Sequence, residues 1–214
     1  MRPSAVEALQ RSRLGPGLRS AASRVQTLRW RRDGCRPPLP PHLKRAKITA
    51  LARLDSFDFF IETGTYRGDT TAAVCRIIGR CYSIELDETL ARLARRRFRR
   101  HPGVTIIDGD SAAALPELVS MLDGRGLIWL DGHFSDGVTA RGDTVTPIEA
   151  ELAAVIQPNQ ADHTILIDDA RLFDGTGGYP SLETVQSLVR SIRPSCSIRV
   201  VDDVIHVTAR SVGR

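Results

Sequence analysis

The sequence predicts an α/β fold, in which a mostly parallel sheet carries helices on both faces and closes with a C-terminal antiparallel hairpin. Short apolar stretches alternate with longer amphipathic ones, which is typical of repeated strand–helix units. The short stretches are apolar throughout, as strands covered on both faces are. Only Asp202 and Asp203 separate the last two apolar stretches. No crossover helix fits between them, so that pair must be antiparallel.

The individual elements follow from the same periodicity, in chain order. The predicted strands cover residues 57–61, 81–84, 104–107, 127–130, 164–167, 197–201 and 204–208. The predicted helices cover residues 4–30, with a break near Gly15-Pro16-Gly17, and then 42–54, 69–78, 88–100, 111–122, 147–156 and 182–192. From residue 57 onward strands and helices therefore form repeated strand–helix units before the terminal hairpin.

A proline-rich segment, Pro37-Pro38-Leu39-Pro40-Pro41, divides the chain. Such a segment is stiff and extended, so we expect residues 1–41 to be a basic helical arm with a linker, and residues 42–214 to be the α/β domain. Residues 1–45 hold 11 Lys and Arg but 2 Asp and Glu, a charge of +9, so the remainder carries −4 of the total of +5. A basic arm can bind nucleic acid, an anionic membrane or an acidic partner, can serve as a transit peptide, or can simply be solvated.

The composition excludes several classes of protein. The chain has 214 residues, of which 42% are hydrophobic and 26% charged, as in ordinary soluble domains. No apolar run reaches the roughly 20 residues that span a bilayer, and no secretory signal follows the basic N-terminus. The four cysteines lack a metal-binding spacing, so we expect reduced thiols and a cytoplasmic protein. The oligomeric state stays open, a homodimer included.

The turn after the first predicted strand is the first candidate binding site. Glycine lets the backbone approach a ligand, and the start of the next helix offers unpaired N–H groups. This turn therefore predicts a nucleotide-like ligand. The candidate residues in it are Glu62, Gly64, Thr65, Tyr66, Gly68 and Thr70.

The ends of the second and third predicted strands supply further candidates. Glu85 could accept hydrogen bonds from two ribose hydroxyls, or it could cap the next helix, a role that Asp87 can fill instead. Asp110 and Ser111 could reach the edge of an adenine ring or act as a helix N-cap, and both roles can coexist.

Three aspartates follow the fourth and fifth predicted strands. Asp131 can face Asp168 and Asp169, because these two strands should be neighbours in the sheet. Three converging carboxylates repel one another unless a cation lies between them, and Mg²⁺ prefers such oxygen ligands. The alternative is that these aspartates cap helices or pair with Arg141 or Arg171.

Taken together, these motifs resemble the cation-dependent small-molecule O-methyltransferases of the catechol and caffeoyl-coenzyme A type. The turn is similar to that group's E-x-G-x-Y-x-G-x-[ST] pattern, and the tyrosine at its centre is a feature of the group. The resemblance covers roughly residues 57–170. Its motifs are Glu62 to Thr70, Ser83-Ile84-Glu85, Gly109-Asp110-Ser111, Leu115-Pro116-Glu117-Leu118, Leu130-Asp131 and Ile167-Asp168-Asp169.

The resemblance implies the class I methyltransferase fold, which is Rossmann-like, and S-adenosylmethionine as methyl donor. It implies that Glu62, Gly64 and Gly68 contact the methionine and ribose part. Glu85 would hold the ribose and Ser111 would lie near the adenine. Asp131 would contact the donor and take part in catalysis. Together with Asp168 and Asp169 it would also bind a magnesium ion.

The sequence departs from the catechol pattern after the fourth strand. The lysine that serves there as base is replaced by Phe134, so His133 or Asp136 would have to accept the proton. The double aspartate is more similar to macrolide and aminocoumarin sugar O-methyltransferases. The loop of residues 134–147 carries Arg141 and Asp143, which favours a polar, sugar-like or anionic acceptor.

The sequence therefore predicts methyl transfer from S-adenosylmethionine to a hydroxyl group of a small molecule, with a divalent metal assisting and His133 as base. One alternative is a protein that binds S-adenosylmethionine without catalysis. Another is a nucleic-acid methyltransferase guided by the basic arm, although Trp30 is the arm's one aromatic residue and RNA recognition favours aromatic platforms.

Overall fold

The structure is a computed structural model that describes residues 16–131, 146–157 and 162–209. The chain divides into two compact units, residues 1–47 and 48–214. Within the described residues, no helix is both long enough and apolar enough to span a bilayer.

The first unit contains a long basic helix followed by the proline-rich segment. Helix α2 covers Pro16–Arg32, and α3 covers Pro41–Leu54 and continues into the second unit. The Trp30 Nε1–H donates to the Arg36 carbonyl at 2.8 Å, which fixes the turn after α2. Thr27 Oγ1 lies 2.7 Å from His42 Nε2, so a hydrogen bond connects α2 with the start of α3.

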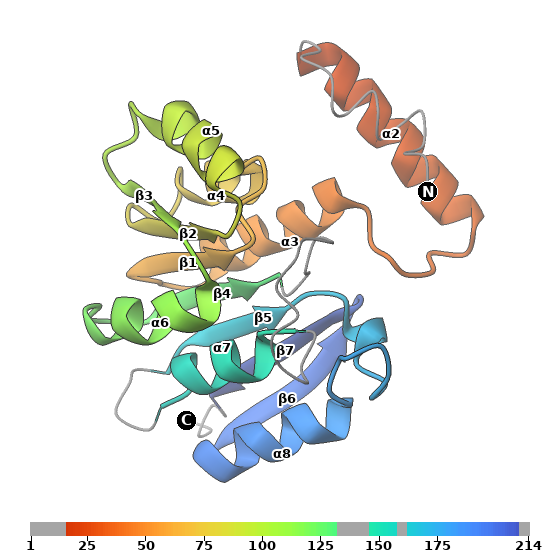
Figure 1. The fold of residues 1–214 in the computed structure, drawn as a ribbon. Coiled ribbons are helices and arrows are strands. Elements are labelled where there is room, and N and C mark those ends of the chain that lie inside the picture. The colour runs from red at the N-terminus through yellow and green to blue at the C-terminus, as the bar shows by residue number, and fades with distance from the viewer. Residues whose placement is uncertain (1–15, 132–145, 158–161, 210–214) are drawn as a thin grey trace. The chain divides into compact units, whose positions relative to one another are not determined.

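The second unit is built on one seven-stranded sheet (Figure 1). Its order is β3-β2-β1-β4-β5-β7-β6. The strands are β1 Phe59–Thr63, β2 Cys81–Glu85, β3 Val104–Asp108, β4 Gly126–Leu130, β5 Thr164–Ile167, β6 Cys196–Val201 and β7 Val204–Ala209. The first five pair in parallel, whereas β7 is antiparallel to both β5 and β6.

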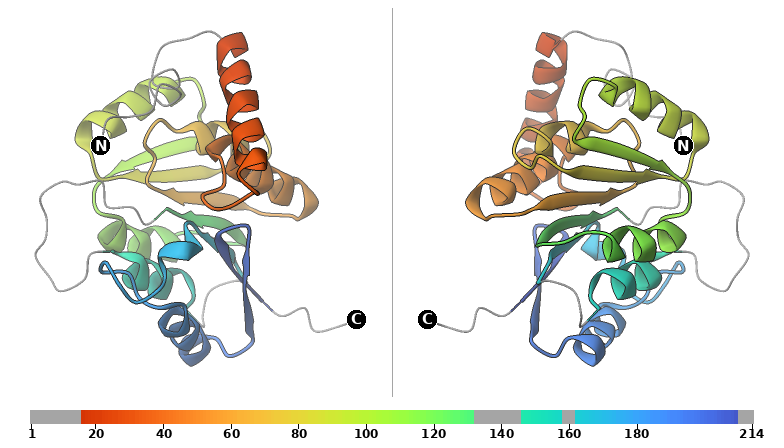
Figure 2. Two further views of the ribbon diagram at one scale, coloured as in Figure 1. Left: turned by 90° about the vertical axis from the view of Figure 1, so that its right-hand side faces the viewer. Right: turned by 90° about the vertical axis from the view of Figure 1, so that its left-hand side faces the viewer.

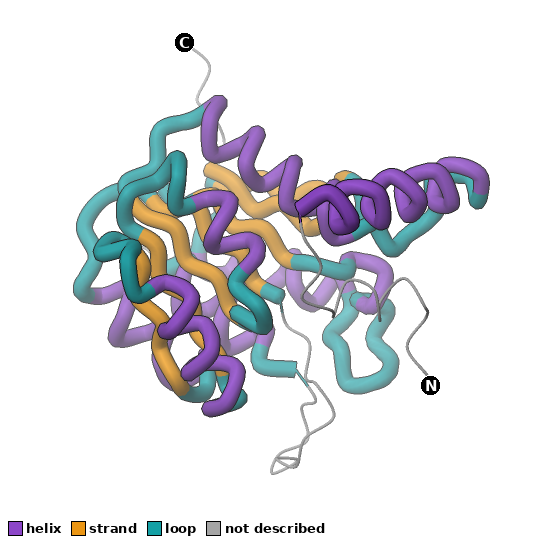
Figure 3. The backbone as a smooth tube through the Cα atoms, turned by 90° about the horizontal axis from the view of Figure 1, so that it is seen from above, coloured by secondary structure: helices purple, strands orange, loops and turns teal. Residues whose placement is uncertain are grey.

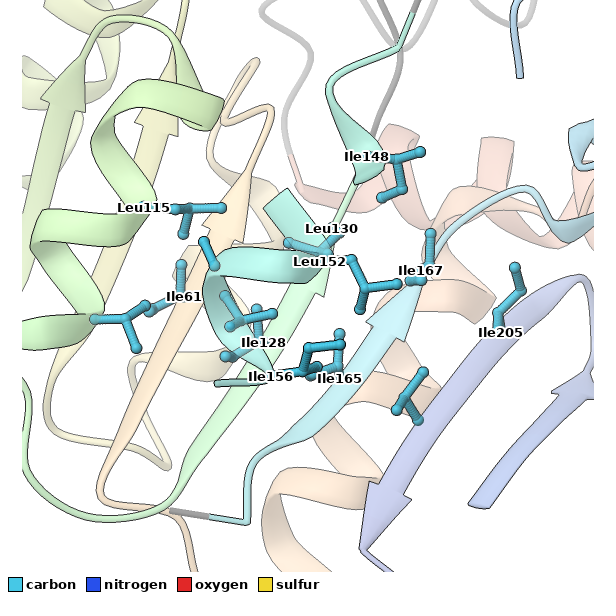
Figure 4. Packing of buried hydrophobic residues seen from close by; sticks show 14 of the residues in the cluster. Ile61, Leu115, Ile128, Leu130, Ile148, Leu152, Ile156, Ile165, Ile167 and Ile205 are labelled. Carbon is cyan, nitrogen blue, oxygen red and sulfur yellow. The ribbon is translucent and has the colours of Figure 1, made fainter. Parts of the chain in front are cut away.

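Helices cover both faces of this sheet, as the views in Figures 2 and 3 show. They are α4 Asp69–Val74, α5 Glu88–Phe98, α6 Ser111–Ser120, α7 Ile148–Val155 and α8 Leu182–Ile192, with a short 3₁₀ turn, η1, at Ala170–Leu172. Alternate strand residues point to opposite faces, so two separate cores form. One core packs the sheet against α6, α7 and α8, and Figure 4 shows its part beside α6 and α7. The other core packs the sheet against α3 and α4. Helix α5 packs in a smaller cluster with Ile106 of β3.

The predicted fold class is confirmed, including the mostly parallel sheet and its terminal antiparallel hairpin. The main differences lie at element ends. Strand β1 ends at Thr63 rather than at residue 61, because Glu62 and Thr63 pair with β2 on one side and β4 on the other. Helix α4 ends at Val74 rather than at residue 78, because Ile77 N already bonds the Val74 carbonyl three residues back.

Candidate functional site

The candidate site lies at the carboxyl edge of the parallel strands. The pairing register places Glu62 opposite Ser83, and Glu85 opposite Asp108, near the ends of β1, β2 and β3. On the other side of β1, Thr63 pairs with Leu130, the residue before Asp131. Ligands of open α/β sheets bind at this edge. The sheet therefore brings the candidates from β1, β2 and β4 to one edge.

Glu62 is a buried carboxyl held by neighbouring hydroxyls. Thr71 donates to its Oε2 at 2.5 Å and Ser83 donates to the same oxygen at 3.1 Å. The pKa of Glu62 is raised to about 7, mainly by burial and also by nearby Asp131, against the lowering effect of the hydroxyls of Thr71, Thr70 and Ser83. Glu62 therefore changes its charge near neutral pH, and its ionised form would attract a cationic ligand group.

Glu85 connects the end of β2 with the turn after β1. Its Oε2 accepts from the Tyr66 N–H at 2.6 Å and its Oε1 accepts from the Asp87 N–H at 3.0 Å. Helix α5 has its own N-cap, because Asp87 accepts from Leu90 N at 2.9 Å. Glu85 is thus free of the capping role, and each of its oxygens keeps capacity for another donor such as a ribose hydroxyl.

The turn of residues 63–68 lies close against its neighbours and has left-handed backbone at three positions, Gly64, Tyr66 and Gly68. A Cβ on Gly64 would lie 3.2 Å from the carbonyl oxygen of Asp131, so glycine lets the turn lie against the end of β4. A Cβ on Gly68 would lie 2.6 Å from a ring carbon of Phe98, which leaves no room for a side chain. The Tyr66 side chain is exposed to solvent, and its backbone has a φ of 47°. Thr65 is buried, and its hydroxyl lies 2.7 Å from that of Ser83.

The turn after β3 both caps a helix and reaches a buried acid. Asp110 is the N-cap of α6 and accepts from Ala112 N at 3.0 Å, so the capping role is confirmed. The Ser111 hydroxyl donates to Oε1 of Glu151 on α7. The structure does not test the donor-binding role expected for Asp110 and Ser111, which stays a prediction.

The structure does not assemble the metal site expected from the three aspartates. Within residues 16–131, 146–157 and 162–209, no three His, Cys, Asp or Glu side chains are grouped to hold a metal ion. Asp169 is instead paired with Arg171, whose Nη1 lies 2.7 Å from its Oδ1, as in the alternative considered above. Arg171 also pairs with Asp203 of the β6–β7 turn. The Arg171 guanidinium already occupies the Asp169 carboxylate, so this aspartate fits a divalent cation poorly.

The aspartate pair after β5 has a local role. Asp168 N bonds the carbonyl of Leu130, which joins the ends of β4 and β5. Asp168 Oδ1 accepts from Asp169 N at 2.7 Å, and Asp169 has a left-handed φ of 55°. Asp203 accepts from Arg171 N at 2.9 Å and its carbonyl accepts from Ala170 N at 2.8 Å. These bonds fix the turn at the end of β5.

Asp131 remains near both buried acids. Its N–H donates to Thr63 Oγ1 at 3.2 Å, and its charge contributes to raising the pKa of Glu62 and of Glu151. His133, the expected base, lies outside the described residues, as do Phe134, Arg141 and Asp143.

Two residues with contacts at the site, Glu151 and Asp203, were not expected from the sequence. Glu151 carried a signal, because it lies three residues after Ile148 and one before Leu152, on the buried stripe of α7. A charged residue on an apolar stripe is rarely buried without a partner or a function. Asp203 carried none, because its partner Arg171 lies 32 residues away in the sequence.

The chain matches no protein-family model and no curated protein sequence. It does match solved structures over most of its length. With Rv0187 from MTB, solved with its cofactor, it shares 18% identity and a TM-score of 0.58, over 98% of both chains. With the SAH-bound methyltransferase PaMTH1 from Podospora anserina it shares 16% identity and a TM-score of 0.57, over 99% of both chains.

A third match is the O-methyltransferase from Bacillus cereus in complex with SAH, at 16% identity and a TM-score of 0.53, over 86% of this chain and 89% of that one. At these identities the likeness shows the fold. The fold is the Rossmann-like fold of class I methyltransferases, in agreement with the strand order and the antiparallel β7.

Proposed function

We propose that the protein transfers a methyl group from S-adenosylmethionine to a hydroxyl group of a small polar molecule. The single observation that carries the proposal is the arrangement of Glu62 and Glu85 around a glycine turn at the carboxyl edge of a methyltransferase-type sheet. Gly64 supports the proposal. A Cβ at this position would lie 3.2 Å from the carbonyl oxygen of Asp131, so the absence of a side chain lets the turn lie close to the end of β4, at the edge where the ligand binds.

The donor-binding roles follow from the contacts of each residue. S-adenosylmethionine, when bound, supplies the methyl group. Glu85 accepts hydrogen bonds from the ribose hydroxyls through oxygens that already orient the Tyr66 turn. Glu62, in its ionised form, attracts the cationic methionine part. Gly64, Thr65, Gly68 and Thr70 shape the turn around it, and Asp110 and Ser111 lie at the adenine end.

Methyl transfer to oxygen needs a nucleophile in line with the methyl group and a group that takes the hydroxyl proton. We assign to His133, two residues after Asp131, the role of the base that accepts the proton of the acceptor hydroxyl. The acceptor is polar, because the segment between β4 and α7 carries Arg141 and Asp143. No step of this proposal passes through a metal, since Asp169 is paired with Arg171.

The proposal is tested with S-adenosylmethionine labelled in its methyl group. The purified chain is incubated with a panel of sugars, sugar phosphates and catechols, and with total RNA as a separate acceptor, each with and without EDTA. We expect label in a hydroxyl compound, and we expect His133→Ala to lower kcat about 100-fold or more, the range of general-base catalysis, with little change in donor affinity.

The other outcomes discriminate between the alternatives. Donor binding without transfer to any acceptor would favour the binding protein without catalysis. Label in RNA alone would favour the nucleic-acid methyltransferase. A chain that binds neither S-adenosylmethionine nor its demethylated product would refute the proposal.

A further inference from the structure

Glu151 is the buried acid at the candidate site to which the proposed function gives no role. It lies on α7 in the buried stripe with Ile148, Leu152 and Val155 and is 1% exposed. Its neighbours come from three other elements: Ser111 at the start of α6, Thr63 at the end of β1, and Asp131 after β4. A core position on a helix thus holds a carboxyl that faces residues of the candidate site.

The two oxygens of Glu151 are not equivalent. Oε1 accepts a hydrogen bond from the Ser111 hydroxyl. Oε2 is buried and, among the described residues, has no hydrogen-bond partner. The Thr63 hydroxyl lies close enough to lower the pKa of Glu151 but makes no hydrogen bond to Oε2. One buried acceptor is therefore left open beside Ser111.

An open acceptor of this kind is costly for a purely structural residue. Leaving a buried polar atom unpaired costs roughly 1–3 kcal/mol. The pKa of Glu151 is raised to about 7, mainly by burial and also by Asp110 and Asp131, against the lowering effect of the Ser111 and Thr63 hydroxyls. A core-forming Leu or Met would fill the same stripe without these costs, so the acid points to a ligand.

We propose that Oε2 of Glu151 accepts a hydrogen bond from the amino group of the donor's adenine ring, and so makes Glu151 a determinant of donor specificity. The inference rests on the proposed use of S-adenosylmethionine. In the proposed binding mode the β3–α6 turn is the adenine end of the site, and Ser111 of this turn donates the hydrogen bond to Oε1. An N–H donor is the group that an open carboxylate oxygen recognises.

The test compares two ligands that differ at one group. S-adenosylhomocysteine carries the amino group, whereas S-inosylhomocysteine carries a carbonyl oxygen there and would place two acceptors against each other. Isothermal titration calorimetry of the full chain at pH 8.5, where Glu151 is mostly ionised, should show S-adenosylhomocysteine binding roughly 10- to 100-fold more tightly, the range of a hydrogen bond to a charged group. In Glu151→Met, which keeps the length but has no carboxyl, the preference should fall below about threefold, mainly through weaker S-adenosylhomocysteine binding.

Two further variants control the test. Glu149→Gln removes a charge from the same helix at a less buried position and should keep the wild-type preference. Glu151→Gln keeps the shape and can turn its NH₂ group toward the inosine oxygen, so the preference should narrow or reverse even if the Met variant does not fold.

An unchanged preference in folded Glu151→Met or in Glu151→Gln would overturn the role of Glu151 and leave the donor proposal standing. A wild-type chain that binds S-adenosylhomocysteine without discriminating against the inosine compound would do the same. A wild-type chain that does not bind S-adenosylhomocysteine at all would overturn both proposals.

Discussion

Replacing Glu62 with glutamine should stabilise the protein at alkaline pH. The carboxyl is fully buried and its pKa is raised from 4.5 to about 7, first by burial. Below pH 4.5 the group is protonated in both the folded and the unfolded chain. Between pH 4.5 and 7 only the unfolded chain releases the proton, so the free energy of unfolding falls as the pH rises, and above pH 7 the loss is complete.

The expected magnitude follows from the difference between the two pKa values. At about 1.4 kcal/mol per pKa unit, the change from 4.5 to about 7 corresponds to roughly 3 kcal/mol. Glutamine is uncharged at every pH, and its carbonyl oxygen can keep the bonds from Thr71 and Ser83 that Oε2 now accepts. The variant should therefore be more stable than the wild type at pH 8, with the advantage vanishing toward pH 4.

Urea denaturation of both chains between pH 5 and pH 8.5, followed by circular dichroism, measures the difference in free energy of unfolding. The exposed Glu117→Gln on α6 controls for the loss of a negative charge and should show no comparable pH dependence. A difference between wild type and Glu62→Gln that stays constant over this range would refute the reasoning, because it would mean that Glu62 ionises alike in both states.

Three other variants test the remaining contacts. Glu85→Ala leaves two backbone N–H groups without their acceptors and should lower the free energy of unfolding by about 1–3 kcal/mol in urea, with Glu85→Gln losing less. Gly68→Ala should lower the free energy of unfolding by about 2–3 kcal/mol, because φ is 69° and the new Cβ would lie 2.6 Å from a ring carbon of Phe98. Gly177→Ala has a similar φ of 59° but open space around it, so it should lower the free energy of unfolding by about 1 kcal/mol. Equal losses in the two variants would contradict the packing argument. Arg171→Met leaves the buried Asp169 and Asp203 without their cation and should lower the free energy of unfolding by about 3 kcal/mol. Neither Mg²⁺ nor EDTA should change the melting temperature of the wild type. A melting temperature that rises with Mg²⁺ would support the metal site after all.

Local patterns were sufficient to predict most of the fold. Each strand–helix unit repeats an apolar run followed by an amphipathic run, and the two-residue gap at Asp202 and Asp203 dictated an antiparallel pair. The end of β1 was less predictable, because Glu62 and Thr63 are polar. They belong to the strand through pairing on both sides, which is a tertiary effect.

The candidate site was predictable where a residue's role depends on its place at a strand end. The positions of Glu62, Glu85 and Asp131 along one sheet edge follow from the alternation of strands and helices alone. Hydrogen-bond partners that lie far apart in the sequence were not predictable. Arg171 and Ser111 are both held by residues at least 30 positions away, Asp203 and Glu151.

Calorimetric titration of the wild-type chain with S-adenosylhomocysteine, beside Glu85→Ala, tests the central claim most directly. The account predicts one binding site on the wild type, and a loss of affinity of about tenfold or more in the variant, since each lost hydrogen bond to a charged acceptor is worth about 1.5–3 kcal/mol. Absence of binding to the wild type, or equal affinity in a folded Glu85→Ala chain, would contradict the claim that this edge of the sheet holds the methyl donor.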